Sequence, residues 1–213
     1  MVDGSLPRTT AAAVLVPVKA FALAKLRLAP TLDPATRAEL ARAMAARVLR
    51  AAHPLPVAVV CDDEEVRAWA ERQGAEAIWT PGLGLNGAVE AGVAHLARRG
   101  VAHAIVAHAD LPLAADLTWL ATEGCVTLVP DRHGDGTNVA SVPTGAGFSF
   151  AYGAGSFASH RVEAARLGLV AQLVPDERLG WDVDLPADLQ LPDHLQLPGD
   201  ISALLAAAEA ACR

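Results

Sequence analysis

The chain has 213 residues, and no Ser/Gly/Pro-rich linker divides it. Because this length suits one ordinary domain, residues 1–213 are predicted to form a single unit. Apolar residues make up 53% of the chain and aromatic residues only 4%. This composition predicts a core of Ala, Val and Leu, with helices packed on a buried sheet.

The charge pattern excludes several classes of partner. The net charge is −7, and no run of Lys and Arg with interleaved aromatic residues is present, which argues against nucleic-acid binding. No apolar run approaches the roughly 18 residues of a membrane span, and residues 1–10 lack the basic and apolar parts of an export signal. We therefore expect a cytoplasmic protein without a membrane partner, and a flexible tail over residues 1–10.

Apolar runs and helical patterns alternate along the first two thirds of the chain. Asp33 and Pro34 indicate a helix start, Gly74 indicates a helix end, and Asn86 is the expected N-cap of a further helix. This alternation predicts an α/β fold with a mostly parallel sheet covered by helices and ligands at the carboxyl ends of the strands. The expected strands are 11–18, 57–61, 77–79, 102–107 and 126–130, and the expected helices are 33–52, 62–73, 86–99 and 114–122.

The texture of the sequence changes after residue 130. Six of the 17 glycines and four of the nine aromatic residues lie between residues 134 and 157. We interpret 131–158 as a local insertion that binds a small acceptor. The Ala-rich last helix packs on its own sheet or on a second subunit, so a homodimer is an open option. The elements expected here are strands at 137–142, 148–150 and 169–174 and helices at 156–167 and 202–212.

Three aspartates are candidates for a metal site. Asp182 and Asp184 are two residues apart, and in an extended segment this spacing places both carboxylates on one face. Asp110 follows the apolar strand 102–107, at the end where an α/β fold binds its ligands. Magnesium takes few protein carboxylates and completes its shell with phosphates and water, so these three residues suit Mg²⁺. The alternative is that they only cap a turn at Asp110 and a helix that begins at Pro186.

Lys19 and Lys25 are the only lysines among the 17 basic residues of the chain. Both lie in the loop after the first strand, and Arg27 follows closely. A compact ammonium group is a good phosphate partner, so this loop is predicted to bind a phosphate chain. A solvated basic helix face is the other interpretation.

A second set of polar residues suits a small anion. Thr137 offers a hydroxyl donor after a glycine-bearing loop. The stretch from Gly153 to Ser156 leads into a helix, whose free N–H groups and positive dipole end favour a phosphate or carboxylate. Ser156 can serve as the N-cap of that helix, with or without a ligand.

Cysteine and histidine provide no further site. The three cysteines, Cys61, Cys125 and Cys212, are too widely separated for a disulfide framework or a zinc site. We expect them to be inert residues. The seven histidines show no metal spacing, so none is assigned to a metal. No pattern indicates a covalent nucleophile.

Six motifs together resemble the 2-phospho-L-lactate and phosphoenolpyruvate guanylyltransferase family of coenzyme F-420 biosynthesis. This family is a branch of the nucleotidyltransferases, with an α/β fold similar to that of molybdenum-cofactor guanylyltransferase. The resemblance covers residues 14–189, although the glycine-rich loop usual after the first strand of nucleotidyltransferases is replaced by Lys and Arg. The motifs are VPVKAFALAKLRLAP, GLNGAV, HADLPLA, VPDRHGDGTNV, FAYGAGSFASH and WDVDLPADL.

The resemblance implies transfer of GMP from GTP to a phosphorylated three-carbon acid, with release of pyrophosphate. It also implies roles for individual residues. The implied catalytic set is Lys19, Lys25, Asp110 and Asp184. The implied ligand sets are Asp110, Asp182 and Asp184 for Mg²⁺, Lys19, Lys25, Arg27 and Asn86 for the nucleotide, and Thr137, Gly153 and Ser156 for the acceptor.

Several alternatives stay open at this point. Phosphoenolpyruvate is the preferred acceptor, ahead of 2-phospholactate and 3-phosphoglycerate. A nucleotidyltransferase for a molybdenum cofactor or a sugar phosphate is a second reading, which would favour a glycine-rich first loop. A non-catalytic nucleotide-binding module is the third, and it would need no clustered carboxylates.

Overall fold

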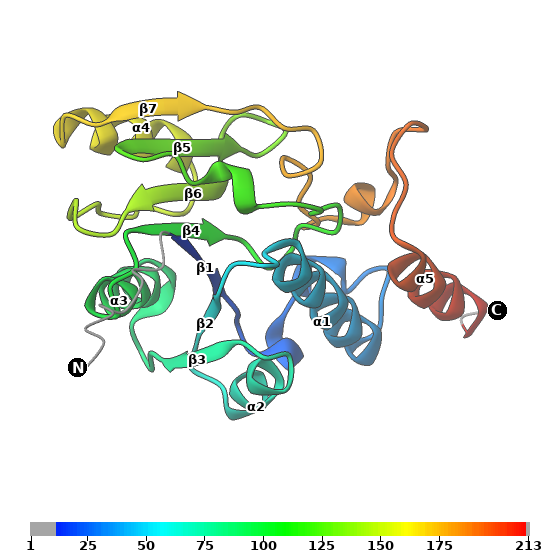
Figure 1. Cartoon of the computed structure of the whole chain (residues 1–213). Coiled ribbons are helices and arrows are strands. Elements are labelled where there is room, and N and C mark those ends of the chain that lie inside the picture. The colour runs from blue at the N-terminus through cyan, green and yellow to red at the C-terminus, as the bar shows by residue number, and fades with distance from the viewer. Residues whose placement is uncertain (1–11, 212–213) are drawn as a thin grey trace.

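The computed structural model describes residues 12–211 (Figure 1), so the expected tail over 1–10 and Cys212 lie outside the described residues. A seven-stranded sheet forms the centre of the molecule. Its strands are β1 (Ala12–Pro17), β2 (Val57–Cys61), β3 (Glu76–Trp79), β4 (His103–Ala107), β5 (Cys125–Pro130), β6 (Thr137–Pro143) and β7 (Val170–Leu173).

The sheet is mixed and mostly parallel, which confirms the predicted fold class. The strand order is β3-β2-β1-β4-β6-β5-β7, and only β6 runs antiparallel, to both β4 and β5. β6 lies inside the sheet, so the stretch 131–158, which we interpret as a local insertion, supplies one of the central strands. The glycines at its start mark a tight turn from β5 into β6, in which the Asp131 carboxylate accepts hydrogen bonds from the backbone N–H groups of His133, Asp135 and Gly136.

Helices cover both faces of the sheet (Figure 1). Asp33 caps the first helix as predicted, because its carboxylate accepts from the N–H groups of Ala35 and Thr36. α1 and α2 pack on one face, α3 and α4 on the other, and α5 lies against α1. The bounds are α1 (Pro34–Ala51), α2 (Glu64–Arg72), α3 (Gly84–Arg98), α4 (Ser156–Arg166) and α5 (Gly199–Ala211).

Two predicted elements are wrong. Residues 114–122 form a loop with a single 3-10 turn, Thr118–Leu120, because the apolar residues that suggested a helix are buried from an extended chain instead. Residues 148–150 are not a strand. Their N–H groups at Ser149 and Phe150 bond to glutamate side chains of α4 and α3 rather than to a neighbouring strand.

One glycine sets how closely α3 approaches the sheet. A Cβ atom at Gly92 would lie 2.7 Å from side-chain carbons of both Leu15 and Val60. Because Leu85 and Ala88 are seven and four residues before Gly92, they share its face of the helix. The start of α3 is therefore held near the carboxyl ends of β1 and β2. Within residues 12–211, no helix is both long and apolar enough to cross a bilayer.

Candidate functional site

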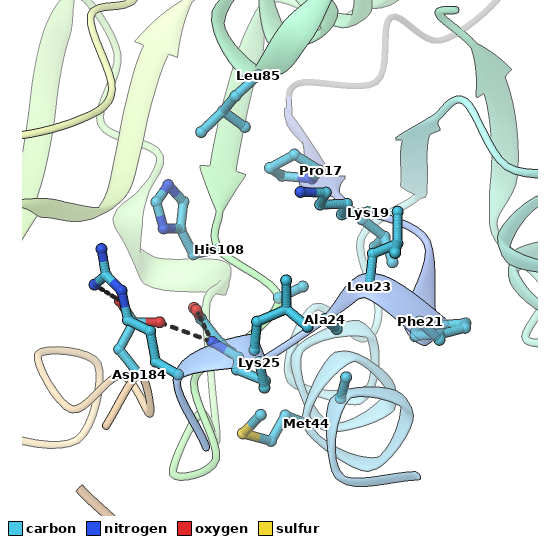
Figure 2. A pocket seen from close by; sticks show the side chains of 16 residues that line it. Pro17, Lys19, Phe21, Leu23, Ala24, Lys25, Met44, Leu85, His108 and Asp184 are labelled. Carbon is cyan, nitrogen blue, oxygen red and sulfur yellow. Dashed lines mark hydrogen bonds and ion pairs between the residues drawn. The ribbon is translucent and has the colours of Figure 1, made fainter. Parts of the chain in front are cut away.

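The cavity that is lined by most of the predicted metal and phosphate residues, called the main cavity, lies at the carboxyl ends of β1 and β4. It has a volume of about 420 Å³ and is shown in Figure 2. The loop after β1 supplies one wall through two 3-10 turns, Phe21–Leu23 and Leu26–Leu28. Asp110 follows β4, and Asp184 enters from the segment before α5. This cavity lies at the strand ends, where the sequence predicts that ligands bind.

Lys25 connects two of the three predicted metal ligands. Its Nζ lies 2.5 Å from Oδ2 of Asp110 and 3.1 Å from Oδ1 of Asp184. Lys25 has a φ of 53°, in the left-handed region that non-glycine residues rarely adopt. This turn between the two 3-10 segments directs the ammonium group toward the carboxylates (Figure 2). Asp184 also pairs with the exposed Arg27, whose Nη1 lies 3.5 Å from Oδ2 of Asp184.

The ion pairs also decide the charge states of these residues. Burial lowers the pKa of Lys25, but the nearby charges of Asp110 and Asp184 outweigh it, so the pKa is raised. Burial raises the pKa of Asp110, but Lys25 and His108 outweigh it, so the pKa is lowered. Lys25 therefore stays an ammonium group and Asp110 a carboxylate at neutral pH.

Arg132 and Asp188 hold the segment that carries the Asp182–Asp184 pair. Arg132 donates to the backbone oxygen of Asp182 at 3.1 Å and also to the carboxylate of Asp188. The second carboxylate oxygen of Asp188 accepts from the N–H groups of Asp184 and Leu185. Asp188, and not the predicted pair, thus satisfies the free N–H groups at the start of the 3-10 helix Pro186–Leu189. The capping alternative for the pair is wrong.

The three aspartates gather at one place. The backbone N–H of Val183 donates to the backbone oxygen of Asp110 at 3.2 Å, so the strand end and the 182–184 segment are joined. Burial and the charge of Asp110 raise the pKa of Asp182, which indicates crowded carboxylates. The buried Oδ1 of Asp110 has no hydrogen-bond partner among the described residues. The cluster thus has hard oxygen donors with spare capacity.

These donors suit a magnesium ion that is also bound by substrate. Within residues 12–211, no three Asp, Glu, His or Cys side chains form a ready-made metal cage. Magnesium needs only one or two protein carboxylates when phosphates and water complete its shell. The crowding of Asp110 and Asp182 and the free oxygen of Asp110 fit such an ion. The described residues alone do not form a complete metal site, so the ion would depend on substrate phosphate for part of its coordination.

A second cavity of about 450 Å³ adjoins the first. The two share Lys19 and Leu85, and the second extends over the ends of β2 and β3 to Thr80. Lys19 is exposed and forms no ion pair among the described residues, which leaves its ammonium group available to an anion. Figure 2 shows Lys19 on the far side of the main cavity from Asp184. The two lysines thus border one continuous hollow.

The structure gives Asn86 a different contact from the one predicted. Asn86 lies inside the first turn of α3 and is not its N-cap, because the helix begins at Gly84. Its Oδ1 accepts from the backbone N–H of Tyr152 at 2.8 Å. Asn86 lines neither cavity. It joins α3 to the segment before α4, and its contact with the nucleotide stays a prediction.

Thr137 and Ser156, two of the predicted acceptor residues, are in direct contact. The N–H of Thr137 donates to Oγ of Ser156 at 3.0 Å. Gly155, with a φ of 70°, is the N-cap of α4, so the prediction of Ser156 as N-cap is wrong. Gly153 has a φ of 130°, a conformation open to glycine but rarely to other residues, and its backbone oxygen accepts from the N–H of Ser156.

This group adjoins the aspartates through Asn138. The Asn138 side chain donates to Oδ1 of Asp182 at 3.4 Å, and its backbone oxygen accepts from the N–H of His108. Since Thr137 directly precedes Asn138 at the start of β6, the two predicted sets of ligands lie on neighbouring strand ends. Two phosphorylated molecules could therefore meet between them.

Sequence reasoning missed a group of buried and half-buried rings that connects His108 to His160. The rings of His108 and Tyr152 are 4.8 Å apart, and those of Tyr152 and His160 are 4.9 Å apart. His108 lines the main cavity, and its Nε2 and the Oη of Tyr152 have no hydrogen-bond partner among the described residues. The only available signal was the cluster of aromatic residues after residue 147, which does not indicate their partners.

The comparison of the sequence with known families decides the classification. Residues 12–192 match the family described as "Guanylyl transferase CofC like". The chain belongs to this guanylyltransferase family. The family resemblance carried by the six motifs is thereby confirmed.

Related proteins support the same family. The phosphoenolpyruvate guanylyltransferase of Sphaerobacter thermophilus is 37% identical over 182 residues, covering 81% of this chain and 88% of that protein. The phosphoenolpyruvate guanylyltransferase of Rubrobacter xylanophilus is 36% identical over 181 residues, covering 81% and 88%. That of Streptomyces coelicolor is 36% identical over 184 residues, covering 80% and 87%.

Solved structures show that the fold is that of nucleotidyltransferases. A nucleotide-diphospho-sugar transferase from Desulfovibrio desulfuricans G20 superposes with a TM-score of 0.71 at 17% identity, over 94% of this chain and 96% of that one. A nucleotidyl transferase from Methanothermobacter thermautotrophicus gives 0.59 at 14% identity, over 84% and 94%. At these identities the likeness concerns the fold alone.

Proposed function

We propose that this protein transfers GMP from GTP to phosphoenolpyruvate and releases pyrophosphate, as a step of coenzyme F-420 biosynthesis. One observation carries the proposal, in a chain that belongs to this family. Asn138 links the charged group that contains Asp182 to the hydroxyl groups of Thr137 and Ser156, so two candidate anion sites lie side by side. The names of the relatives supply the acceptor. Phosphoenolpyruvate is thus preferred over 2-phospholactate and 3-phosphoglycerate.

The nucleotide is proposed to occupy the two adjoining cavities. Lys19 lines both cavities and Arg27 lines the main cavity, and both side chains carry an exposed charge. Lys25 and Asp110 also line the main cavity. The triphosphate would lie along the loop after β1, where side-chain cations replace a glycine-rich loop. The guanosine would extend toward Thr80 over the ends of β2 and β3.

The acceptor phosphate is proposed to attack the α-phosphorus of GTP. A new bond forms between its oxygen and that phosphorus, while the bond to the bridging oxygen breaks and pyrophosphate leaves. Because a phosphate monoester is largely ionised at neutral pH, no general base is required. Catalysis then depends on alignment and on charge neutralisation by Lys25 and its neighbours.

Asp110, Asp182 and Asp184 are the residues proposed to hold magnesium. When bound, the ion neutralises charge on the phosphate oxygens. Lys25 keeps Asp110 and Asp184 together before substrate arrives, since its ammonium group bridges them. Asn138 and Arg132 fix Asp182 at its side chain and backbone.

The test is a coupled assay of pyrophosphate release from GTP, run with and without Mg²⁺ and with each three-carbon acid in turn. Release with phosphoenolpyruvate, and a product whose mass equals the acid plus GMP, is the expected result. Preference for 3-phosphoglycerate would change the acceptor but keep the reaction. No release with any of the three acids would overturn the proposed function.

A further inference from the structure

We infer that His160 is a positioning residue, which fixes the Thr137 hydroxyl as a hydrogen-bond donor toward the acid acceptor. This inference rests on the proposed function and adds a residue to it. His160 lies on α4 and is 0% exposed. It is neither a metal ligand nor a residue of the two cavities, so its contacts need another explanation.

Both ring nitrogens of His160 are bonded. The backbone N–H of Ala151 donates to Nε2 at 3.0 Å, and Nδ1 lies 3.0 Å from Oγ1 of Thr137. The rings of Phe148, Phe150 and Tyr152 surround the imidazole at centroid distances of 5.7, 5.9 and 4.9 Å. The ring is thus held in one orientation by two hydrogen bonds and an aromatic cage.

These contacts select one tautomer. A backbone N–H can only donate, so Nε2 must accept and carries no hydrogen. Burial, aided by His108, lowers the pKa of His160 to about 4, although Glu163 opposes the shift, so the ring is neutral at physiological pH. Its single hydrogen must therefore be on Nδ1, and Nδ1 donates to Oγ1 of Thr137.

The orientation of the Thr137 hydroxyl follows from this tautomer. Because Oγ1 accepts from His160, its own hydrogen must point to another acceptor. Ser156 is in the same condition, since its Oγ accepts from the N–H of Thr137. No acceptor for either hydroxyl hydrogen is found among the described residues. The fold therefore presents two oriented O–H donors that lack an acceptor.

An anionic oxygen of the acceptor would satisfy both donors. Thr137 and Ser156 are each 1% exposed, while the neighbouring Gly153 is exposed, so in the proposed site the two hydroxyl groups would lie beneath an acceptor that binds beside Gly153. A buried hydroxyl without an acceptor is unfavourable. A phosphate or carboxylate that enters beside Gly153 removes this cost. A water molecule would remove less of it, because a hydrogen bond to a charged oxygen is stronger than one to a neutral oxygen.

A double-mutant cycle on Thr137 and His160 tests the inference. Thr137→Val removes the hydroxyl but keeps the shape, and His160→Leu removes both hydrogen bonds of the ring. Each is expected to raise the KM for phosphoenolpyruvate about tenfold and to leave the KM for GTP unchanged. The double variant should show about the same tenfold increase as either single variant, because both remove the same donor.

Two further variants serve as rescue and control. His160→Gln keeps an amide acceptor and donor and should restore the KM for phosphoenolpyruvate to within about threefold of the wild type. Ser141→Ala is the matched control, because Ser141 is fully buried on the same strand and its hydroxyl forms no hydrogen bond within the described chain. Its KM values should match those of the wild type.

Nitrogen NMR of the wild-type protein tests the same inference without any variant. The expected spectrum has a protonated Nδ1 and an unprotonated Nε2 for His160. Protonation at Nε2, or multiplied KM effects in the double variant, would overturn the role of His160 while wild-type turnover keeps the proposed function. An inactive wild type would overturn the proposed function, and the inference with it.

Discussion

The two halves of the site are built on opposite physical principles. Around Lys25 the residues are charged and partly open to solvent, with the Asp184 side chain 47% exposed and that of Arg27 73% exposed. Around Thr137 and His160 the residues are neutral, buried and enclosed by aromatic rings. Charged groups in contact with water can adjust to a long flexible triphosphate, whereas a buried network must be formed in advance. The proposed nucleotide site can therefore rearrange on binding, whereas the proposed acceptor site is fixed before its ligand arrives.

The largest expected effect is a loss of turnover when one aspartate of the charged half is replaced. Asp184→Asn keeps the shape but removes one charge from the carboxylate cluster, so pyrophosphate release should fall roughly a thousandfold with little change in the unfolding midpoint. Asp193→Asn is the matched control, since Asp193 is exposed and forms no ion pair among the described residues. Full activity of Asp184→Asn would remove the aspartate from the catalytic cluster.

The two lysines should separate structure from nucleotide binding. Lys25→Met leaves the buried Asp110 carboxylate without its cation, so the free energy of unfolding should decrease by about 3 kcal/mol as turnover falls. Lys19→Met should leave unfolding unchanged and raise the KM for GTP about tenfold, because an exposed cation is lost. Urea denaturation and GTP saturation curves measure the two quantities. Equal stability losses in both variants would contradict the assigned roles.

The buried half should be sensitive to acid through His160. Its pKa is about 4 in the folded protein and 6.5 without burial, so the unfolded chain binds the proton first as the pH falls. The contribution of His160 is present above pH 6.5 and is lost between about pH 6.5 and 4, amounting to about 3 kcal/mol. Denaturation of wild type and His160→Leu at several pH values measures it as a difference. Parallel pH profiles for the two proteins would exclude this contribution.

The smallest expected effect concerns the support of the aspartate pair. Arg132→Lys loses the planar fork whose two terminal nitrogens reach the Asp182 backbone and the Asp188 carboxylate, so turnover should fall about fivefold. Arg132 lies over the ring of Trp181, at 4.4 Å from its centroid. Arg161→Lys is the control, because Arg161 likewise lies over the ring of Phe157, at 5.8 Å, but pairs with no carboxylate among the described residues. Steady-state rates for the two variants should therefore differ.

The sequence indicated the charged half better than the buried half. Asp110 could be predicted because the end of an apolar strand is a recognisable place in an α/β fold, and the Asp182/Asp184 spacing is local. The bridging position of Lys25 could not, because it depends on a left-handed turn and on a partner 159 residues away. His160 gave no signal, since a single histidine on a helix shows neither its partners nor its burial.

The errors in the fold have a similar origin. The buried residues Ala114, Leu117 and Leu120 are three apart, which imitates a helical period although the chain between them is a loop. Two of the six clustered glycines precede β6 and four follow it, and this texture does not show that the strand lies inside the sheet. Local patterns identify apolar faces, but only the pairing with β4 and β5 shows where such a face is used.

Gly92 controls the distance between α3 and the sheet, although it does not line either of the two adjoining cavities. A methyl group at this position would meet Leu15 and Val60 at 2.7 Å, so the helix would have to move away from the sheet and take Leu85 with it. Leu85 borders both cavities. The separation of α3 from the sheet beside the cavities therefore depends on the hydrogen atom that Gly92 carries in place of a side chain, two turns along α3. Gly92→Ala is therefore expected to change the shape of both cavities, although Gly92 lines neither of them.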